Sequence, residues 1–184
     1  MIQDWNDPEY CLEAVKRDGH ALEYVINQTP EICLQAVKRH GLALEYVINQ
    51  TQEICLEAVK RTGHALRFVN NQTPEICLEV VKENGYALAF VINQTSEMCL
   101  EAVKQNGFAL EDVKEQTPDI CLEAVKQKGR AFRFVKNQTP LIIHYLKKYH
   151  ILIYESFKKE NRITIPDNEM VEFYEENPHL LLTL

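Results

Sequence analysis

One stretch of the chain, Thr29–Gln50, reads TPEICLQAVKRHGLALEYVINQ and is enough to predict the fold. The hydroxyl of Thr29 can cap a helix by accepting a hydrogen bond from a free N–H of the first turn, and Pro30 suits the first helical position. Gly41 suits the end of that helix, because glycine tolerates the left-handed conformation that often terminates a helix. We therefore expect a helix between residues 30 and 40.

The second half of the stretch, residues 42–50, predicts a shorter helix, in which Ala43, Leu44 and Val47 share one face. The first helix carries a similar apolar stripe, made of Ile32, Cys33, Ala36 and Val37. Two helices this short cannot bury these faces alone, so neighbouring units must stack into a continuous core.

The same pattern recurs six times with a period of 22 residues and without insertions. We define repeats 1 to 6 as Asp7–Gln28, Thr29–Gln50, Thr51–Gln72, Thr73–Gln94, Thr95–Gln116 and Thr117–Gln138. A leucine-rich repeat has a similar period but needs alternating leucines, whereas the apolar residues here have helical spacing. The expected fold is therefore an all-α solenoid of tandem two-helix repeats.

The two ends of the array expose apolar faces that something must cover. We expect residues 1–6, with Trp5, to form an N-terminal cap in front of the six repeats at 7–138. Residues 139–184 are expected to form a degenerate repeat and capping helices.

In this C-terminal region Ile151 stands where a repeat would have glycine, and we expect the helix that starts at Pro140 to continue past Ile153. A last helix is expected from about Asn168 to Glu176, and the apolar tail Leu180–Leu182 is expected to dock.

Composition narrows the functional classes. The chain is 46% hydrophobic and 26% charged, as folded domains are. Its net charge of −7 argues against nucleic acid as a partner. The chain has neither an apolar run long enough for a membrane span nor a signal peptide at its start, so we expect an intracellular protein without a membrane partner. Because no catalytic or phosphate-binding motif occurs, we expect neither an enzyme nor a cofactor.

Cysteine and histidine do not predict a metal site or a disulfide. The six cysteines recur at one repeat position, so neighbours should lie about 8–10 Å apart, too far for a disulfide or a shared zinc ion. We expect six buried, reduced thiols. No two of the six histidines form a recognisable ligand pair, and His20 and His64, at one repeat position, should be about 16–20 Å apart.

Each repeat ends in glutamine, threonine follows it in all six copies, and asparagine usually precedes it. We expect these junctions to satisfy free backbone groups at the helix ends rather than to form a ladder that binds a ligand.

Positions that vary between repeats are the candidates for recognition. The position after the repeat glycine carries His20, Leu42, His64, Tyr86, Phe108 and Arg130, and its variation predicts exposure and partner binding. Four residues further along, Tyr24, Tyr46, Phe68, Phe90, Asp112 and Phe134 form a more uniform series, which we assign to packing between repeats rather than to ligand contact.

Charge changes sign along the chain. Residues 1–116 have a net charge of −8, residues 117–162 of +6 and residues 163–184 of −5. We call residues 117–162 the basic segment, and its candidate patch consists of Lys126, Lys128, Arg133, Lys136, Lys147 and Lys148. Either the acidic terminal helix folds back on the basic segment, which we favour, or the segment binds an acidic partner.

The motif that combines TPEICLEAVK, glycine, Ala-Leu, valine and Asn-Gln-Thr resembles a helical repeat family of unknown function, found in giant DNA viruses of amoebae and in some intracellular bacteria. The resemblance covers residues 7 to about 140. It implies an α-helical repeat fold and a viral or pathogen origin, hence a place in host cytoplasm or virion. It supplies no activity or site residues.

Our leading interpretation is a non-enzymatic scaffold that binds a protein partner, viral or from the host. The alternative is a structural component that associates with itself in a viral particle or assembly.

Overall fold

The computed structural model describes residues 4–181. Each repeat begins with a ten-residue α-helix: α1 Pro8–Arg17, α2 Pro30–Arg39, α3 Gln52–Arg61, α4 Pro74–Glu83, α5 Ser96–Gln105 and α6 Pro118–Gln127. Each repeat continues with a six-residue 3-10 helix: η1 Gly19–Tyr24, η2 Gly41–Tyr46, η3 Gly63–Phe68, η4 Gly85–Phe90, η5 Gly107–Asp112 and η6 Gly129–Phe134. Four helices follow the repeats: α7 Pro140–Tyr149, α8 Ile151–Lys159, α9 Asp167–Glu176 and α10 Pro178–Leu181.

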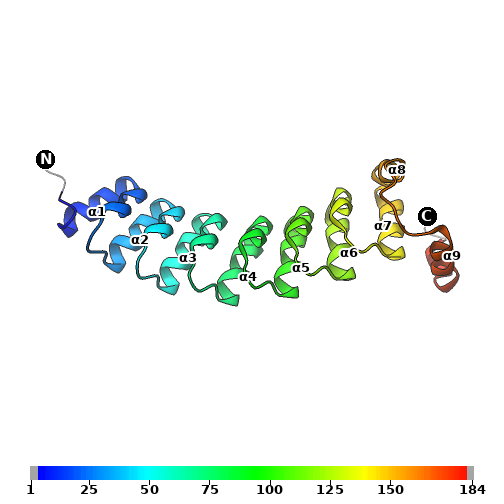
Figure 1. Ribbon diagram of the computed structural model, residues 1–184, viewed down its shortest axis with the longest axis horizontal. Helices are drawn as coiled ribbons and strands as arrows, with labels where there is room; N and C mark the ends of the chain where they lie inside the picture. Colours follow the sequence, from blue (N-terminus) through cyan, green and yellow to red (C-terminus); the bar gives the residue numbers. More distant parts are fainter. Residues whose placement is uncertain (1–3, 182–184) are drawn as a thin grey trace. The chain divides into compact units, whose positions relative to one another are not determined.

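The chain forms two compact units, residues 1–93 and residues 94–184. In the first unit α1 to α4 lie side by side in chain order, and in the second α5, α6 and α7 do the same (Figure 1). The core of each unit runs along its stack and is built from the expected stripes, which in repeat 2 are Ile32, Cys33, Ala36, Val37, Ala43, Leu44 and Val47. The expected all-α tandem-repeat solenoid is therefore confirmed.

The helix starts follow the predicted capping chemistry. The Thr29 hydroxyl accepts a hydrogen bond from the backbone N–H of Ile32 at 3.3 Å, and Pro30 occupies the first turn. Asp7 takes the place of threonine in repeat 1, where its carboxylate accepts from the backbone N–H of Glu9 at 3.0 Å. The start of each first helix could thus be predicted to the residue.

The ends of these helices differ from the prediction. Among the described residues, which include all six glycines, no glycine has a positive φ. The residue before the glycine ends the helix instead, as His40 does with φ −137° and ψ 109° in extended backbone. Gly41 is needed for close approach, because a Cβ there would lie 2.5 Å from the carbonyl oxygen of Ala58 in the next repeat.

The second half of each repeat is a 3-10 helix, a tighter element than the prediction implied. In η2 the backbone N–H of Ala43 donates to the carbonyl of His40, and that of Val47 donates to the carbonyl of Leu44. Six residues complete two turns of such a helix, so Ala43 and Leu44 are buried while the other side faces outward.

The glutamine at each junction bonds to the following repeat. The Nε2 of Gln50 donates to the carbonyl oxygen of Phe68 at 2.8 Å, and its Oε1 accepts from the backbone N–H of Asn70 at 2.9 Å. The same Oε1 lies 3.5 Å from the thiol of Cys55. These bonds satisfy backbone groups, as predicted, and they tie neighbouring repeats together in a way that the sequence did not show.

At the start of the chain, Trp5 packs on the first repeat, with its ring 5.2 Å from that of Tyr10 and 5.3 Å from that of Tyr24. The Cys11 thiol donates to the Trp5 carbonyl oxygen at 3.3 Å. Residues 1–3 of the expected cap lie outside the described residues.

The expectation that one helix would continue past Ile153 was wrong. The helix α7 ends at Tyr149, and a separate helix, α8, starts at Ile151 because His150 leaves helical geometry with ψ 47°. The left-handed termination expected at the glycines occurs instead after α8, where Asn161 has φ 54° and the N–H of Arg162 donates to the Phe157 carbonyl at 2.9 Å.

The bond pattern of the repeats continues into this C-terminal region. Gln138 donates to the carbonyl of Arg162 at 2.7 Å and accepts from the N–H of Thr164 at 2.9 Å. The loop between α8 and α9 thus takes the position of a following repeat. Phe157 is buried, with its ring 5.2 Å from that of Phe132.

The acidic helix α9 begins at Asp167, close to the expected start, and packs on α7. Its contact is aromatic, since the Tyr174 hydroxyl lies 3.1 Å from Nδ1 of buried His144. Among the described side chains, no carboxylate of α9 forms an ion pair with the basic segment. In the expected docking tail, Leu180 and Leu181 belong to α10, and Leu182 lies outside the described residues.

None of the helices within residues 4–181 combines the length and the apolar character needed to cross a membrane.

Candidate interaction surface

The 3-10 helices carry the two variable series on their outer side. Ala43 and Leu44 anchor η2 in the core, which leaves Leu42, Glu45 and Tyr46 on the outer side. The same arrangement recurs in the other 3-10 helices, so each unit presents one row of residues that follow the glycine and a second row of mostly aromatic residues.

The two rows contact each other between repeats. The ring of His20 lies 6.4 Å from that of Tyr46, and the ring of His64 lies 5.1 Å from that of Phe90. In the second unit the ring of Phe108 lies 6.3 Å from that of Phe134. Tyr46, Phe90 and Phe134 therefore pack between repeats, as expected, whereas Tyr24 is exposed and contacts Trp5.

The position after the glycine is mostly exposed, as its variation predicted. His20, Leu42, His64, Tyr86 and Arg130 are exposed.

Phe108 is the exception, because it is only half exposed. The Lys128 ammonium lies 4.8 Å from the centre of its ring, and the Arg133 guanidinium lies 5.4 Å from it. Two cations thus cover the aromatic side chain that we expected to be free for a partner.

The predicted basic patch is partly engaged within the protein. Lys128 and Arg133 cover Phe108, and the Lys136 ammonium lies 3.5 Å from two backbone carbonyls of the preceding repeat. Lys126 pairs with Glu123 at 3.7 Å, and Lys147 and Lys148 are half-buried on α7. The six cations therefore do not form one uniform basic surface.

A cleft of about 390 Å³ in the first unit lies over the junctions of repeats 2 to 4, where Ile48, Gln50, Asn70 and Ile76 are among its lining residues. Its polar side consists mainly of amides, so it offers hydrogen bonds without charge.

A second cleft, of about 460 Å³, lies between η6 and α8 in the second unit, and we call it the arginine cleft. Its lining includes the cationic side chains Arg130, Arg133 and Arg162 and the apolar side chains Leu152, Ile153 and Phe157. Glu160 also lines it and pairs with Arg162 at 3.6 Å, leaving a net positive charge. Guanidinium groups beside apolar surface suit a ligand that carries both a carboxylate and an apolar side chain.

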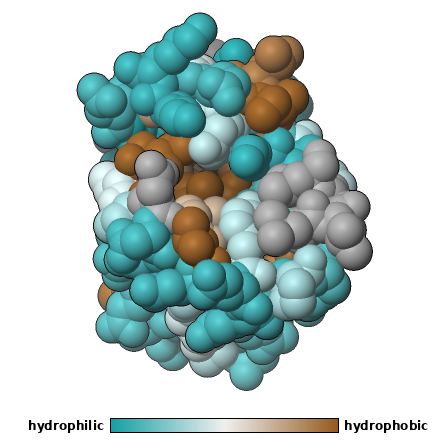
Figure 2. Space-filling view, turned by 90° about the vertical axis from the view of Figure 1, so that its right-hand side faces the viewer, coloured by the Kyte–Doolittle hydropathy of each residue, from teal (hydrophilic) through white to brown (hydrophobic). Residues whose placement is uncertain are grey.

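Apolar side chains of α7 and α8 lie open to solvent, and one of them, Leu152, also lines this cleft. Leu152 is 84% exposed, and Tyr149, Ile151 and Leu141 are also exposed. Figure 2, which faces the end of the chain that carries α7, α8 and α9, shows hydrophobic surface in the middle and along an upper edge, framed by hydrophilic side chains.

Sequence reasoning missed two exposed apolar sets. One consists of Ile26, Ile48 and Ile92, each more than 60% exposed in the turn after a 3-10 helix. Asn70 occupies the same repeat position, so the variation that marked the position after the glycine could have found these residues too. The other is Leu152, which no repeat position could identify because α8 departs from the pattern.

All six cysteines are buried and free, as expected. Burial raises the pKa of each thiol, and for Cys121 to about 11. Since the thiolate is the reactive and metal-binding form, these side chains act as small apolar residues of the core.

One sequence family matches the repeats. The family model described as "Domain of unknown function (DUF4116)" matches residues 29–73, 51–94, 73–117 and 95–139, each match covering about two repeats. The comparisons with curated proteins and with solved structures gave no match.

Proposed function

Because the chain belongs to the DUF4116 repeat family, whose function is unknown, we propose from its surface that it is a non-enzymatic scaffold that binds a protein partner. The observation that carries the proposal is the arginine cleft, which is lined by three arginines and by apolar residues that include the 84% exposed Leu152. The fitting partner is a protein segment in which an apolar residue is flanked by Asp or Glu.

The scaffold suits this function because the polar side chains that recur at the helix ends are already hydrogen-bonded to the backbone. The junction glutamines and the capping threonines bond to backbone, so the recurring residues build the stack. The varying residues remain on the surface, and Arg130 connects the row after the glycine to the arginine cleft. A protein of this design presents different side chains on a common frame, as repeat scaffolds do.

The acidic helix α9 does not neutralise the cleft within the same chain. It is held on α7 through His144 and Tyr174, and its four described carboxylates, those of Glu169, Glu172, Glu175 and Glu176, are exposed and outside the ion pairs that the structure contains. The cleft therefore has charge left for an acidic partner.

A peptide library displayed on phage tests the proposal while the partner is still unidentified. The full-length protein should enrich peptides with an apolar residue next to Asp or Glu. Binding of these peptides should fall at least about tenfold in the variants Arg133→Glu and Leu152→Asp. The first variant removes a cation that attracts the acidic residue, and the second removes an apolar side chain that contacts the apolar residue. The matched control is Arg67→Glu, at the position of repeat 3 that corresponds to Arg133, which should bind as the wild type does. Enrichment without acidic residues, or equal loss in the control, would contradict the proposal.

The second candidate function is self-association in a structural assembly. The apolar residues Leu141, Tyr149, Ile151 and Leu152 favour it, because exposed apolar patches often mark contacts between proteins. In this case Leu152→Asp should dissociate an oligomer in sedimentation velocity, whereas Ile26→Asp, an equally polar change at another exposed apolar site, should leave it intact.

The resemblance to repeats of giant viruses of amoebae leads us to place the partner among viral or host proteins, inside the host cell or the virion. A pull-down with the enriched peptides as competitors would test this placement, because a true partner should be displaced by them.

A further inference from the structure

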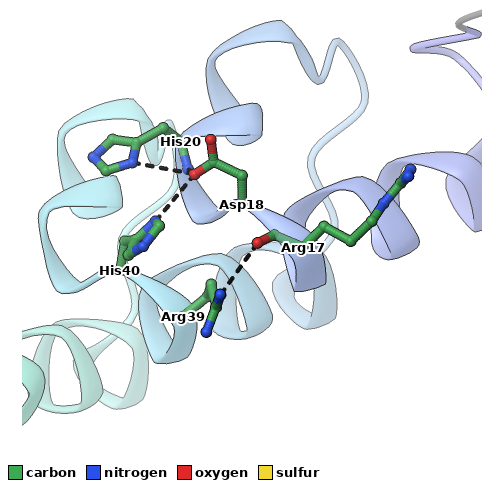
Figure 3. Close-up of polar contacts among 5 residues, drawn as sticks. All are labelled: Arg17, Asp18, His20, Arg39 and His40. Atoms are coloured by element: carbon green, nitrogen blue, oxygen red, sulfur yellow. Dashed lines mark hydrogen bonds and ion pairs between the residues drawn. The ribbon is translucent and has the colours of Figure 1, made fainter.

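Three side chains of metal-binding types, one aspartate and two histidines, meet where the first two repeats join. Asp18 lies between α1 and η1, His20 is the second residue of η1, and His40 follows α2. One ligand atom from each lies within 4.8 Å of the others. Figure 3 shows both imidazole rings turned toward the carboxylate of Asp18.

The distances suit a single metal ion. Nδ1 of His20 is 3.3 Å and Nδ1 of His40 is 3.1 Å from the same oxygen, Oδ1 of Asp18. A tetrahedral zinc ion with bonds of about 2.0–2.1 Å holds its ligand atoms about 3.3 Å apart. The two ring centres are 4.7 Å apart, so both rings reach this region together.

Hydrogen bonding within the protein does not account for His40. Its Nδ1 is buried and forms no hydrogen bond with the described residues, and its polar contact is Oδ1 of Asp18, at an ion-pair distance of 3.1 Å. A buried polar nitrogen without a partner is costly, and a bound cation between the nitrogen and the carboxylate would satisfy both.

The carboxylate of Asp18 is held in place by the backbone. The backbone N–H of His20 donates to Oδ1 of Asp18 at 3.0 Å. The nearby cation of Arg39 is turned to the carbonyl oxygen of Arg17, to which its Nε donates at 3.2 Å.

The other repeat pairs of the first unit lack this set of ligands. The corresponding residues are His40, Leu42 and Thr62 in the next pair, and Thr62, His64 and Asn84 in the pair after it. The cluster is therefore a property of repeats 1 and 2 and not of the repeat pattern, which explains why spacing along the sequence did not predict it. The sequence analysis found no ligand pair among the histidines, whereas the structure brings His20 and His40 to the same carboxylate.

We propose that Asp18, His20 and His40 bind one Zn²⁺ ion that fastens the first repeat to the second. Two imidazoles and one carboxylate are ligands that zinc takes in proteins, and the exposed fourth position would carry water. The metal would add a link between two repeats that already pack through α1 and α2, and so would resist opening of repeat 1 from repeat 2. This proposal is independent of the proposed partner binding.

The test is calorimetric titration of the full-length, reduced protein with ZnCl₂. We expect one ion per chain, and at least about tenfold weaker binding in each of three variants, because even partners of a ligand change affinity by about that much. The variants copy residues from other repeats of the chain, which favours normal folding: His20→Leu as at Leu42, His40→Thr as at Thr62, and Asp18→Asn as at Asn84. Asn84 makes the same capping bond, at 3.1 Å, so Asp18→Asn keeps the cap and removes the charge.

The matched control is His64→Leu, which removes a histidine at the same repeat position without touching the cluster, and it should bind zinc as the wild type does. Hydrogen exchange provides a second readout. With free zinc at about 100 times its dissociation constant, exchange through opening of repeat 1 should slow about 100-fold in the wild type and stay unchanged in His40→Thr.

Three results would overturn the proposal: no stoichiometric binding, equal binding by the three variants and the wild type, or equal loss in the His64 control. Substitution with Co²⁺ separates the cluster from the cysteines, because thiolate ligands add an intense charge-transfer absorption. Its presence would assign the metal to sulfur and contradict the site.

Discussion

The close approach of successive repeats predicts that Gly41→Ala is strongly destabilising. The new Cβ would lie 2.5 Å from the carbonyl oxygen of Ala58 and 2.9 Å from Cγ2 of Thr62. That carbonyl already accepts the hydrogen bond at the end of α3, from the backbone N–H of Thr62 at 3.1 Å. Relieving the contact means moving α3 away from η2 by roughly 0.9 Å, which loosens the packing along the whole contact.

The magnitude follows from three opposing effects. Overpacking costs about 1–3 kcal/mol, and a weakened hydrogen bond adds about 1 kcal/mol. Alanine recovers about 0.4–1 kcal/mol because it restricts the unfolded chain. We therefore expect the free energy of unfolding to fall by about 2 kcal/mol, and the melting temperature to fall by about 4–8 °C for a chain of this size.

The assay is urea unfolding followed by far-UV circular dichroism, with Gly63→Ala as the matched control. A Cβ on Gly63 would meet only side chains, Ala87 at 3.2 Å and Val80 at 3.4 Å, so its cost should stay below about 1 kcal/mol. If these glycines instead served as left-handed helix ends, both substitutions would cost about the same. Equal losses in the two variants would thus refute the reasoning.

Three further predictions test the junctions, the thiols and the C-terminal helices. Gln50→Ala should lower the free energy of unfolding by about 2–3 kcal/mol in urea titrations, because the Phe68 carbonyl and the Asn70 N–H lose their partner; a loss below about 0.5 kcal/mol would contradict the role of this amide. The six thiols should react with Ellman's reagent at pH 8 far more slowly in the native than in the unfolded protein, and with a pKa of about 11 the Cys121 thiol is only about 0.1% thiolate at that pH; rapid native labelling of several thiols would show that the core is open. Burial, and then Lys148 and Lys147, lower the pKa of His144 in the folded protein. As the pH drops from 7 to 5, His144 therefore takes up a proton more readily in the unfolded chain than in the folded one, and stability should fall. Urea unfolding at both pH values should show a smaller fall for His144→Gln, and an equal fall would assign the pH dependence to other groups.

The fold could be predicted largely because the residues that cap and pack each helix recur in six repeats. The threonine caps, the proline after them and the apolar stripe act within a few residues of one another, so the α-helices could be placed almost to the residue. The role of glycine could not be read in the same way. A glycine that ends a helix and a glycine that allows close packing look the same in a sequence. At Gly41 the two roles are distinguished only by the carbonyl oxygen of Ala58, which the structure places against it.

The candidate sites depended on contacts that repeat spacing does not describe. The row after the glycine was found because its residues vary, and the exposed isoleucines were missed although they vary too. The arginine cleft needed the break at His150, which turns α8 so that Leu152 and Phe157 lie near η6. The cluster of Asp18, His20 and His40 joins two equivalent residues of repeats 1 and 2, Asp18 and His40, with a residue of another repeat position, His20, and only the packing of the two repeats brings the three together.

The mass of the purified protein, measured by light scattering over a wide concentration series, distinguishes a surface that binds another partner from one that binds a second copy of this chain. For a surface that binds another partner we expect a monomer of 21.4 kDa at every concentration. A mass that rises to a discrete oligomer, and returns to that of the monomer with Leu152→Asp, would contradict it and assign the surface to self-association.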